Sequence, residues 1–416
     1  MNDLLKTASI ACMALTISSG AALAADNPET IIKDGKFFGE VRYRYENVDQ
    51  DGIADKANAS TVRTNIGFET GKYEGFKALI EAQIVQNIGS EDFNDTTNGK
   101  TAKPVIADPD TTEINQLWLS YNILPDSVVK LGRQKIGFDN QRFVGGVNWR
   151  QNDQTYDAIG LTSHSIENLE LTYHYISNVN RIQGNDHPLG DLDSNIHLAR
   201  ASYQFANWLT ATGYGYWLDF DIQPQLSSKT FGIHVQGDTP INDTWSFAYE
   251  ADIATQEDHA NNTASYDEEY YHFAPTIQGL GWRFTLGYEV LGGDGTNSFQ
   301  TPLATAHKYN GWADKFLSTP VDGLQDMYAT IGYKASGIHD WIDGTKFSAT
   351  YHDFEGDEDG DFGTEIDLSV GKTFTIADDG QPFKNISVLL KYADFDSEDA
   401  PYKDTQKFWL QIGTKF

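Results

Sequence analysis

The chain has 416 residues, of which 39% are hydrophobic and 13% are Phe, Tyr or Trp, and its 30 Lys and Arg against 60 Asp and Glu leave a formal net charge of -30. This balance argues against nucleic acid as a partner, because a polyanion is bound by clustered positive charge, and the many aromatic residues argue against a disordered chain. Beyond residue 25, no segment approaches the roughly 20 consecutive apolar residues of a membrane-spanning helix.

The first 24 residues are predicted to be a secretory signal peptide. Lys6 precedes an apolar stretch over residues 7–17, and residues 22–24 have the small-residue spacing of a cleavage site. We expect the mature chain to form a single domain over residues 25–416. The sole cysteine of the sequence, Cys12, lies inside the predicted signal, and lipid attachment there is an alternative that residues 9–11 match poorly.

Beyond the signal, apolar and polar residues alternate along the chain. Val41, Tyr43 and Tyr45 fall on one face of an extended segment, and Arg42 and Arg44 fall on the other. A period of two predicts β-strands, and we expect about 18 of them, each near the ten residues with which a tilted strand crosses a bilayer. The predicted strands cover residues 36–47, 60–73, 75–88, 112–124, 127–134, 156–163, 167–179, 194–206, 208–220, 228–238, 243–255, 268–279, 281–291, 325–336, 341–354, 363–375, 383–396 and 406–416.

The connections between these strands alternate between tight and long. Tight turns are predicted at 74–75, 125–126, 206–207, 240–243, 280–281 and 378–380, and long polar loops at 89–111, 135–155, 180–193 and 292–324. Short turns at one rim and long loops at the other are typical of an up-and-down antiparallel transmembrane β-barrel, with periplasmic turns and extracellular loops. We therefore predict an all-β barrel in the bacterial outer membrane, in contact with its lipid and lipopolysaccharide.

The last strand carries a further signal of this class. Phe408, Leu410, Ile412 and the terminal Phe416 share one face of the predicted strand. A final aromatic residue on an alternating strand resembles the signal by which the barrel assembly machinery recognises outer-membrane proteins. The alternative is a soluble protein whose last strand happens to end in Phe.

Charged residues on the polar face of the strands are expected to line a water-filled lumen. The predicted lumen charges are Arg42, Arg44, Arg63, Arg200, Glu81, Glu250, Arg283 and Glu289. Positive charge is concentrated toward the N-terminal third, and opposed basic and acidic walls would set ion preference. The alternative is that these charges mainly pair with each other and keep the lumen wet.

The segment over residues 131–161 is dense in Arg, Asn, Gln and Asp. Its runs GRQ, DNQRFVG and WRQNDQTYDA resemble the alginate export family of outer-membrane proteins. The resemblance implies an 18-stranded barrel that passes an anionic polysaccharide through a positively charged constriction. It also implies pore or constriction roles for Arg133, Arg142, Arg150 and Asp157. Guanidinium and indole groups hold carboxylates and sugar rings, so Trp149 joins this set.

We expect the connection at 135–155 to fold into the pore. The alternative is that it only narrows and stiffens the barrel. The predicted function is a porin-like channel for passive diffusion of small hydrophilic solutes, anionic or saccharide, with oligosaccharides among its partners. The departure from the family pattern is that the inward positions carry both signs of charge.

Enzymatic chemistry has little support in the sequence. No HExxH, GxSxG, phosphate-loop or dinucleotide pattern occurs, so we expect no catalysis, no cofactor and no metal. A barrel hydrolase using Ser163, His164 and His174 is one alternative function, and a closed structural or adhesive barrel is another. The acidic run at 355–361 approaches a calcium-loop spacing, but Ile366 occupies the twelfth position, which favours a solvated loop.

Overall fold

The computed structural model describes residues 28–377 and 383–416. The predicted signal peptide and the predicted turn at 378–380 lie outside these residues. Within the described ranges, no helix has the length and apolar character needed to cross a membrane. The chain is built almost entirely from antiparallel strands, with a short helix α2 (Thr30–Lys33) before the first of them.

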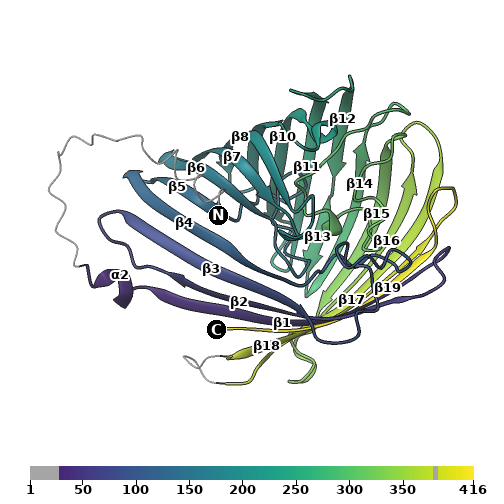
Figure 1. Cartoon of the computed structure of the whole chain (residues 1–416), viewed down its shortest axis with the longest axis horizontal. Helices are drawn as coiled ribbons and strands as arrows, with labels where there is room; N and C mark the ends of the chain where they lie inside the picture. The colour runs from purple at the N-terminus through teal and green to yellow at the C-terminus, as the bar shows by residue number, and fades with distance from the viewer. Residues whose placement is uncertain (1–27, 378–382) are drawn as a thin grey trace.

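The strands follow each other around a ring in chain order (Figure 1). The first ten are β1 (Lys36–Gln50), β2 (Ala57–Glu69), β3 (Phe76–Asn87), β4 (Thr111–Leu124), β5 (Ser127–Gln134), β6 (Thr155–Ile166), β7 (Leu169–Asn180), β8 (Asp191–Ala206), β9 (Leu209–Leu218) and β10 (Ser228–Pro240). The others are β11 (Trp245–Asp258), β12 (Asp267–Phe273), β13 (Thr276–Gly279), β14 (Trp282–Leu291), β15 (Leu324–Lys334), β16 (Lys346–Glu355), β17 (Asp361–Thr375), β18 (Asn385–Asp396) and β19 (Thr405–Lys415). Two short 3-10 helices, η1 (Pro224–Leu226) and η2 (Ala306–Lys308), lie in connections.

Two of these segments, β12 and β13, form one wall position. Both pair with β11 on one side and with β14 on the other. The break between them falls at Ala274 and Pro275, because proline has no N–H to donate to the ladder. The barrel therefore has 18 strand positions, which confirms the predicted number.

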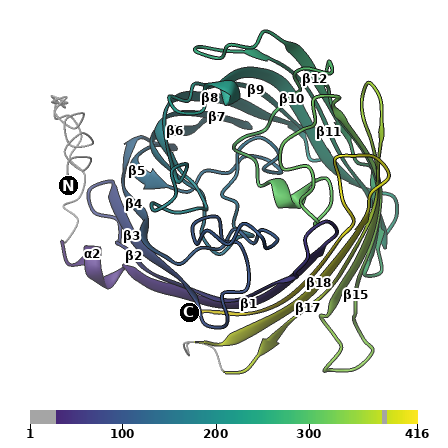
Figure 2. The same ribbon diagram turned by 45° about the vertical axis from the view of Figure 1, so that its right-hand side comes forward.

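The ring closes between the two ends of the chain. β1 pairs with β2 on one side and with β19 on the other, with Tyr43 opposite Ile412 in the closing ladder. Figure 2 shows the continuous wall. Closure gives every strand two neighbours, which a sheet in hydrocarbon needs because its edge groups would find no hydrogen-bond partner there.

The two faces of the wall differ as the alternation predicts. On β14, Leu286 is 67% exposed on the outer face, whereas Glu289 is 2% exposed on the inner face. On the last strand, Phe408 and Ile412 are exposed and Trp409 is buried inside. An apolar outer face and a polar inner face are typical of a barrel surrounded by lipid.

Two of the tight turns have central residues with positive φ. Glu74 and Gly75 have φ of 46° and 87°, and Leu280 and Gly281 have φ of 54° and 84°. Positive φ at both central residues matches the twist of a two-residue hairpin. These turns confirm two of the predicted tight connections.

One strand starts later than expected. The predicted strand at 341–354 begins only at Lys346, because residues 335–345 fold into a longer turn. The carboxylate of Asp343 accepts the backbone N–H groups of Gly337, Ile338 and His339, which closes this turn. Such a side-chain bond competes with strand pairing.

Two long connections from the opposite rim enter the ring, and we name them loop A (residues 135–154) and loop B (residues 292–323). Figure 2 looks into the ring and shows both inside the wall. They bring apolar side chains against inward-facing residues of the strands, including Phe138, Phe299 and Phe316 against Leu198 and Phe354. The inner face is thus partly an apolar core, which corrects the expectation that it faces only water.

The assignment of residues to the outer and inner faces can be tested by placing a charge on each. Replacing Leu286 by Arg places a cation in hydrocarbon near mid-strand, and we expect the free energy of unfolding to fall by about 2–4 kcal/mol. Thr330→Arg is the control, since Thr330 lines the lumen cavity described below. Urea unfolding in lipid vesicles measures both variants, and equal losses would contradict the assignment of the two faces.

Candidate functional site

Loop A is held against the wall formed by β1 and β2. The Nε of Arg42 donates to Gln151 Oε1 at 2.9 Å. Arg63 donates to Glu40 Oε1 at 2.7 Å and to Asp153 Oδ1 at 2.9 Å. Arg42 and Arg63 therefore do point inward, and most of their donors are bound by groups of the protein itself, although the Nε of Arg63 has no hydrogen-bond partner.

Arg150 of loop A pairs with two buried carboxylates. Its Nη2 lies 2.6 Å from Glu46 Oε2 and 2.7 Å from Asp108 Oδ2, and its Nε donates to Asp108 Oδ1 at 3.0 Å. Burial acts to raise the pKa of Asp108, but the nearby guanidinium of Arg150 outweighs it and lowers the pKa to about 2. All three side chains are buried, so loop A is tied to β1 and to the connection that precedes β4.

Arg142 joins loop A to loop B and to the opposite wall. Its Nε donates to Glu289 Oε1 at 2.7 Å, and its Nη2 donates to Asn310 Oδ1 at 3.0 Å. Tyr270 donates its hydroxyl to the same glutamate at 2.7 Å. Arg142 thus spans the lumen from loop A to β14.

Trp149 belongs to an aromatic cluster that surrounds one lysine. Its ring stacks on His307 with centroids 4.4 Å apart and planes 7° apart. Lys391 Nζ lies 4.0 Å from the Trp149 centroid and 3.5 Å from that of Trp312, and Trp409 closes a third side at 5.3 Å. We call Trp149, Trp312, Trp409 and Lys391 the indole cage. Cation–π contacts of this kind are stronger when desolvated.

His307 of loop B connects the cage to an ion pair. Its Nδ1 lies 2.7 Å from Asp314 Oδ1, its Nε2 lies 2.7 Å from Lys391 Nζ, and Lys407 contacts Asp314 at 2.8 Å. These contacts fit a neutral imidazole that donates to the carboxylate and accepts from the ammonium. Burial lowers the pKa of His307 to about 3. We call the contacts of His307 with Asp314 and Lys391 the loop B latch, and they are made by the uncharged ring.

Other predicted lumen charges also point inward. Arg200 donates to Asp139 of loop A, and Arg44 lies over the Trp149 ring at 4.0 Å. Glu81 accepts from Asn65 at 2.8 Å. Glu250, Arg283 and Glu289 line the lumen cavity.

Arg133 and Asp157 are placed apart from this network. They form a direct pair across β5 and β6, with Nε to Oδ1 at 2.8 Å, and both are partly exposed. They alternate with the buried residues Gln134 and Tyr156, so they lie on the opposite side of the wall from these two. A bulge follows Asp157, where this part of the wall is irregular. A role for this pair in the constriction stays a prediction.

A cavity of about 770 Å³ remains in the lumen between loops A and B and strands β9 to β17. Its lining combines carboxylates, amides and hydroxyls with the rings of Tyr249, Tyr309, Trp312 and Tyr328. Polar groups that converge on a space of this size are typical of small-molecule sites. The cavity is therefore the candidate solute site.

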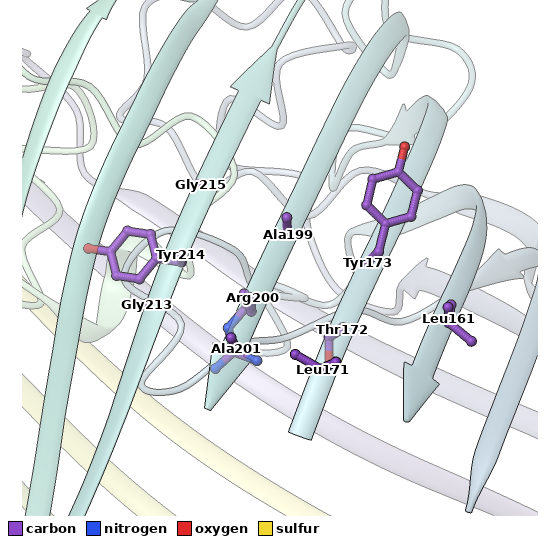
Figure 3. Close-up of a pocket in the computed structure, with 10 residues that line it drawn as sticks. All are labelled: Leu161, Leu171, Thr172, Tyr173, Ala199, Arg200, Ala201, Gly213, Tyr214 and Gly215. Carbon is purple, nitrogen blue, oxygen red and sulfur yellow. The ribbon is translucent and has the colours of Figure 1, made fainter. Parts of the chain in front are cut away.

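A second hollow of about 370 Å³ lies over β6 to β9 (Figure 3). It includes the outer-face residues Leu161, Leu171, Ala201 and Gly213, and its exposed lining is mainly apolar. It shares no residue with the lumen cavity. Small outward residues leave this depression where the wall is expected to face hydrocarbon, so it is not a candidate solute site.

The residues of the hydrolase alternative are not brought together. Ser163 bonds with Ser127 at 2.8 Å, His164 lies 3.6 Å from Glu170, and His174 packs beside Phe138. Across residues 28–377 and 383–416, no group of three or more His, Cys, Asp or Glu side chains is arranged to hold a metal ion.

The sequence alone did not identify the indole cage. Lys391 and Trp409 face each other in the β18–β19 ladder, but Trp149 and Trp312 come from distant parts of the chain, and only loops A and B bring them to this pair. One signal was available, since Trp409 falls on the inward face of the last strand, where a large apolar ring requires a partner.

Comparisons with known proteins agree with this architecture. The alginate export family model matches residues 36–314. The structure is similar to OccAB2 of Acinetobacter baumannii, with 17% identity, a TM-score of 0.73 and coverage of 93% of this chain and 99% of that one. OccK1 (OpdK) of Pseudomonas aeruginosa is 14% identical, with a TM-score of 0.73 and coverage of 93% of this chain and 99% of that one. A structure of OpdK with vanillate has the same identity, TM-score and coverage. At these identities the likeness shows the fold. No curated protein matches the sequence.

The anchoring of loop A can be tested with Arg150→Ala. The substitution leaves Glu46 and Asp108 buried without their main cation, and we expect the free energy of unfolding to fall by about 3–5 kcal/mol. Arg133→Ala removes a partly exposed pair and should cost less than about 1 kcal/mol. Urea unfolding of both variants measures the difference. Equal losses of unfolding free energy in the two variants would contradict the claim that Arg150 anchors loop A.

The buried, neutral ring of His307 leads us to predict that the attachment of loop B depends on pH. The latched ring is neutral, whereas a released ring has an ordinary pKa near 6.5, so the latch is fully stable above about pH 6.5. As the pH falls from there toward 3, release should become favoured about tenfold per pH unit. Limited proteolysis of loop B at pH 7.5 and pH 5 measures this, with His307→Gln as the variant that should lose the dependence. The same slope in both proteins would contradict the assignment.

Proposed function

Because the chain belongs to the alginate export family, we propose that it passes small hydrophilic solutes by passive diffusion, and that saccharides are the class its lumen fits best. The protein is an outer-membrane β-barrel of the porin-like type. The observation that carries the proposal is the polar cavity of about 770 Å³ enclosed by an 18-strand wall with an apolar outer face. Such a cylinder separates a hydrated path from lipid.

The lining of the cavity suits hydroxyl-rich solutes. Tyr249, Tyr309 and Tyr328 offer ring faces, and Asn207 and Gln236 offer amides that both donate and accept. Hydrogen-bonding groups in both senses match a sugar ring, whose hydroxyls also donate and accept. These contacts are weak and numerous, which allows a solute to enter and also to leave.

Anionic solutes require cationic side chains that are free to meet them. Arg142 and Arg150 are bound by carboxylates and amides of the protein, so their availability to a solute stays a prediction. Arg283 and Lys308 do line the cavity and support an anionic solute there. OpdK was solved with vanillate, a small aromatic carboxylate. Small anions are accordingly the second solute class of this proposal.

Loops A and B determine how the path is shaped. Both are fixed to the wall by buried ion pairs and by the indole cage, so the cavity has walls that hold their position. A rigid lining supports diffusion with a constant cross-section, without a moving gate. The same loops favour the closed structural barrel as a second function, since they occupy much of the ring (Figure 2).

Planar bilayers separate these two functions. Purified protein should give discrete conductance steps, and a neutral disaccharide at millimolar concentration should interrupt the current as it enters the cavity. Tyr309→Ala and Tyr328→Ala remove ring contacts and should shorten these interruptions, whereas Tyr203→Ala on the outer face is the control. Silent membranes after repeated insertion of folded protein would favour the closed barrel.

A further inference from the structure

Four threonines form a continuous row on the inner face of the wall. Thr276, Thr285, Thr330 and Thr350 stand directly opposite one another in the register of β13 to β16. Side chains directly opposite in an antiparallel pair point to the same face, and all four of these residues line the lumen cavity. We call them the hydroxyl row.

The hydroxyl groups of the row are bonded in pairs. Thr276 Oγ1 lies 2.8 Å from Thr285 Oγ1, and Thr330 Oγ1 lies 2.9 Å from Thr350 Oγ1. Each hydroxyl has one hydrogen and two lone pairs, so a bonded pair keeps both donor and acceptor capacity for a further partner. Thr276 and Thr285 are buried, whereas Thr330 and Thr350 are partly exposed. The Thr330–Thr350 pair is therefore the part of the row that a solute in the cavity can reach.

An aromatic ring lies next to this pair, on the side of loop B. Tyr328 precedes Thr330 by two residues on β15, so both side chains point into the lumen. Tyr328 stands directly opposite Gly287 of β14. A Cβ built at Gly287 would overlap Cζ, Cε1 and Cε2 of Tyr328, so the ring occupies the space that a side chain there would fill. The missing side chain of Gly287 thus allows the ring to lie against the wall.

Two imidazole rings hold Tyr328 in this position. The tyrosine hydroxyl lies 3.0 Å from Nε2 of His272, and the planes of the two rings are 16° apart. His352 stands directly opposite Tyr328 on β16, with ring centroids 5.5 Å apart. The hydroxyl of Tyr328 is therefore engaged, and the partly exposed ring is what it offers to the cavity. We call Tyr328, His272 and His352 the ring platform.

The charged groups beside the platform are partnered within the protein. His352 lies 2.9 Å from Asp326 and 3.7 Å from Asp367. Arg142 of loop A pairs with Glu289 at 2.7 Å. The groups that the ring platform and the hydroxyl row leave free for a solute are thus a ring face and hydroxyls, which are uncharged.

A ring face beside free hydroxyl capacity suits a sugar in its closed pyranose form. The C–H groups on one face of a pyranose are apolar and meet the electron-rich face of an aromatic ring favourably. The hydroxyls at the edge of the same sugar then lie where Thr330 and Thr350 can donate to them and accept from them. An open-chain polyol has hydroxyls of the same kind but no flat apolar face to place on the tyrosine.

We propose that the ring platform and the hydroxyl row form a subsite for a closed sugar ring, which stacks on Tyr328 and bonds through its edge hydroxyls to Thr330 and Thr350. Gly287 is the positioning residue, because it gives the tyrosine ring its place against the wall. This inference rests on the proposed function and deepens it. The subsite selects cyclic sugars over open-chain polyols.

Two probes separate ring stacking from hydrogen bonding. Methyl β-glucopyranoside is locked as a closed ring, whereas sorbitol is an open chain with more hydroxyl groups. Each is titrated against folded protein in a detergent without a sugar headgroup, and saturation-transfer NMR from the aromatic protons of the protein reports binding. We expect the glucoside to bind about two- to tenfold more tightly than sorbitol, with the strongest transfer to the C–H groups of one face of the sugar.

Gly287→Ala tests the position of the ring without removing any group that contacts the sugar. The added methyl group displaces the ring of Tyr328, so the preference for the glucoside over sorbitol should be lost. Gly213→Ala is the matched control, since a Cβ at this outer-face glycine meets no atom within 4 Å, and it should keep the preference. Tyr328→Leu, which keeps apolar bulk but removes the aromatic face, gives the same test should Gly287→Ala fail to fold.

The hydroxyl row is tested separately. The double variant Thr330→Val with Thr350→Val keeps the shape of both side chains, and it should weaken binding of both probes about two- to tenfold. Thr212→Val with Ser202→Ala is the matched control, because these two residues form a similar pair at 2.9 Å on β9 and β8 and do not line the cavity. Heat-modifiable migration shows that each variant is folded.

The outcomes separate this inference from the function on which it rests. Conductance steps in planar bilayers combined with equal binding of the two probes would overturn the subsite and leave the channel. Silent bilayers combined with a preference for the glucoside would overturn the channel and leave the subsite. A preference that survives in folded Gly287→Ala or Tyr328→Leu protein would also overturn the subsite, since Tyr328 would then not carry it.

Discussion

The absence of hydrogen-bond partners in hydrocarbon is the constraint on which this structure depends. It requires that β1 and β19, the two ends of the wall, pair with each other, and their register runs over the length of both strands. Closure then creates an inner surface that the chain must either fill or leave wet. Loops A and B fill part of it, and the lumen cavity is the part that remains.

The contacts that hold the loops inside the barrel differ between the two sides of the wall. They are mainly ion pairs against β1 and β2, and mainly hydrogen bonds to backbone and amide groups against β14 to β17. Against β1 and β2, arginines of the wall and of loop A meet buried carboxylates such as Asp108 and Asp153. Buried charges of this kind are costly to desolvate, so they favour one arrangement of the loop more than they add stability. Against β14 to β17, loop B supplies mostly backbone N–H groups and Asn310 to an acidic wall. On this side Arg142 of loop A also pairs with Glu289, and His352 of the wall contacts Asp326 and Asp367.

Much of the fold could be predicted from the sequence, because a period of two is a local property. Strand number, outer face, tight turns and the last strand all followed from it. The break at Pro275, the late start at Lys346 and the inner apolar residues such as Leu198 did not, because turn chemistry and loop packing override alternation. The partners of Arg142 and Lys391 are separated from them by 147 and 84 residues for their closest contacts, so no local pattern could reveal them.

Amide hydrogen exchange in lipid nanodiscs tests the central claim most directly, namely a closed wall with loop A bound inside it. Amides of β1 and β19 should exchange as slowly as those of β16 and β17. Within loop A, the N–H groups of Gln151 and Asp153, which donate to side chains of Asp108 and Gln83, should also be protected. Fast exchange at β1 and β19 while the other strands stay protected would contradict the closed wall, and fast exchange at Gln151 and Asp153 would contradict the bound loop.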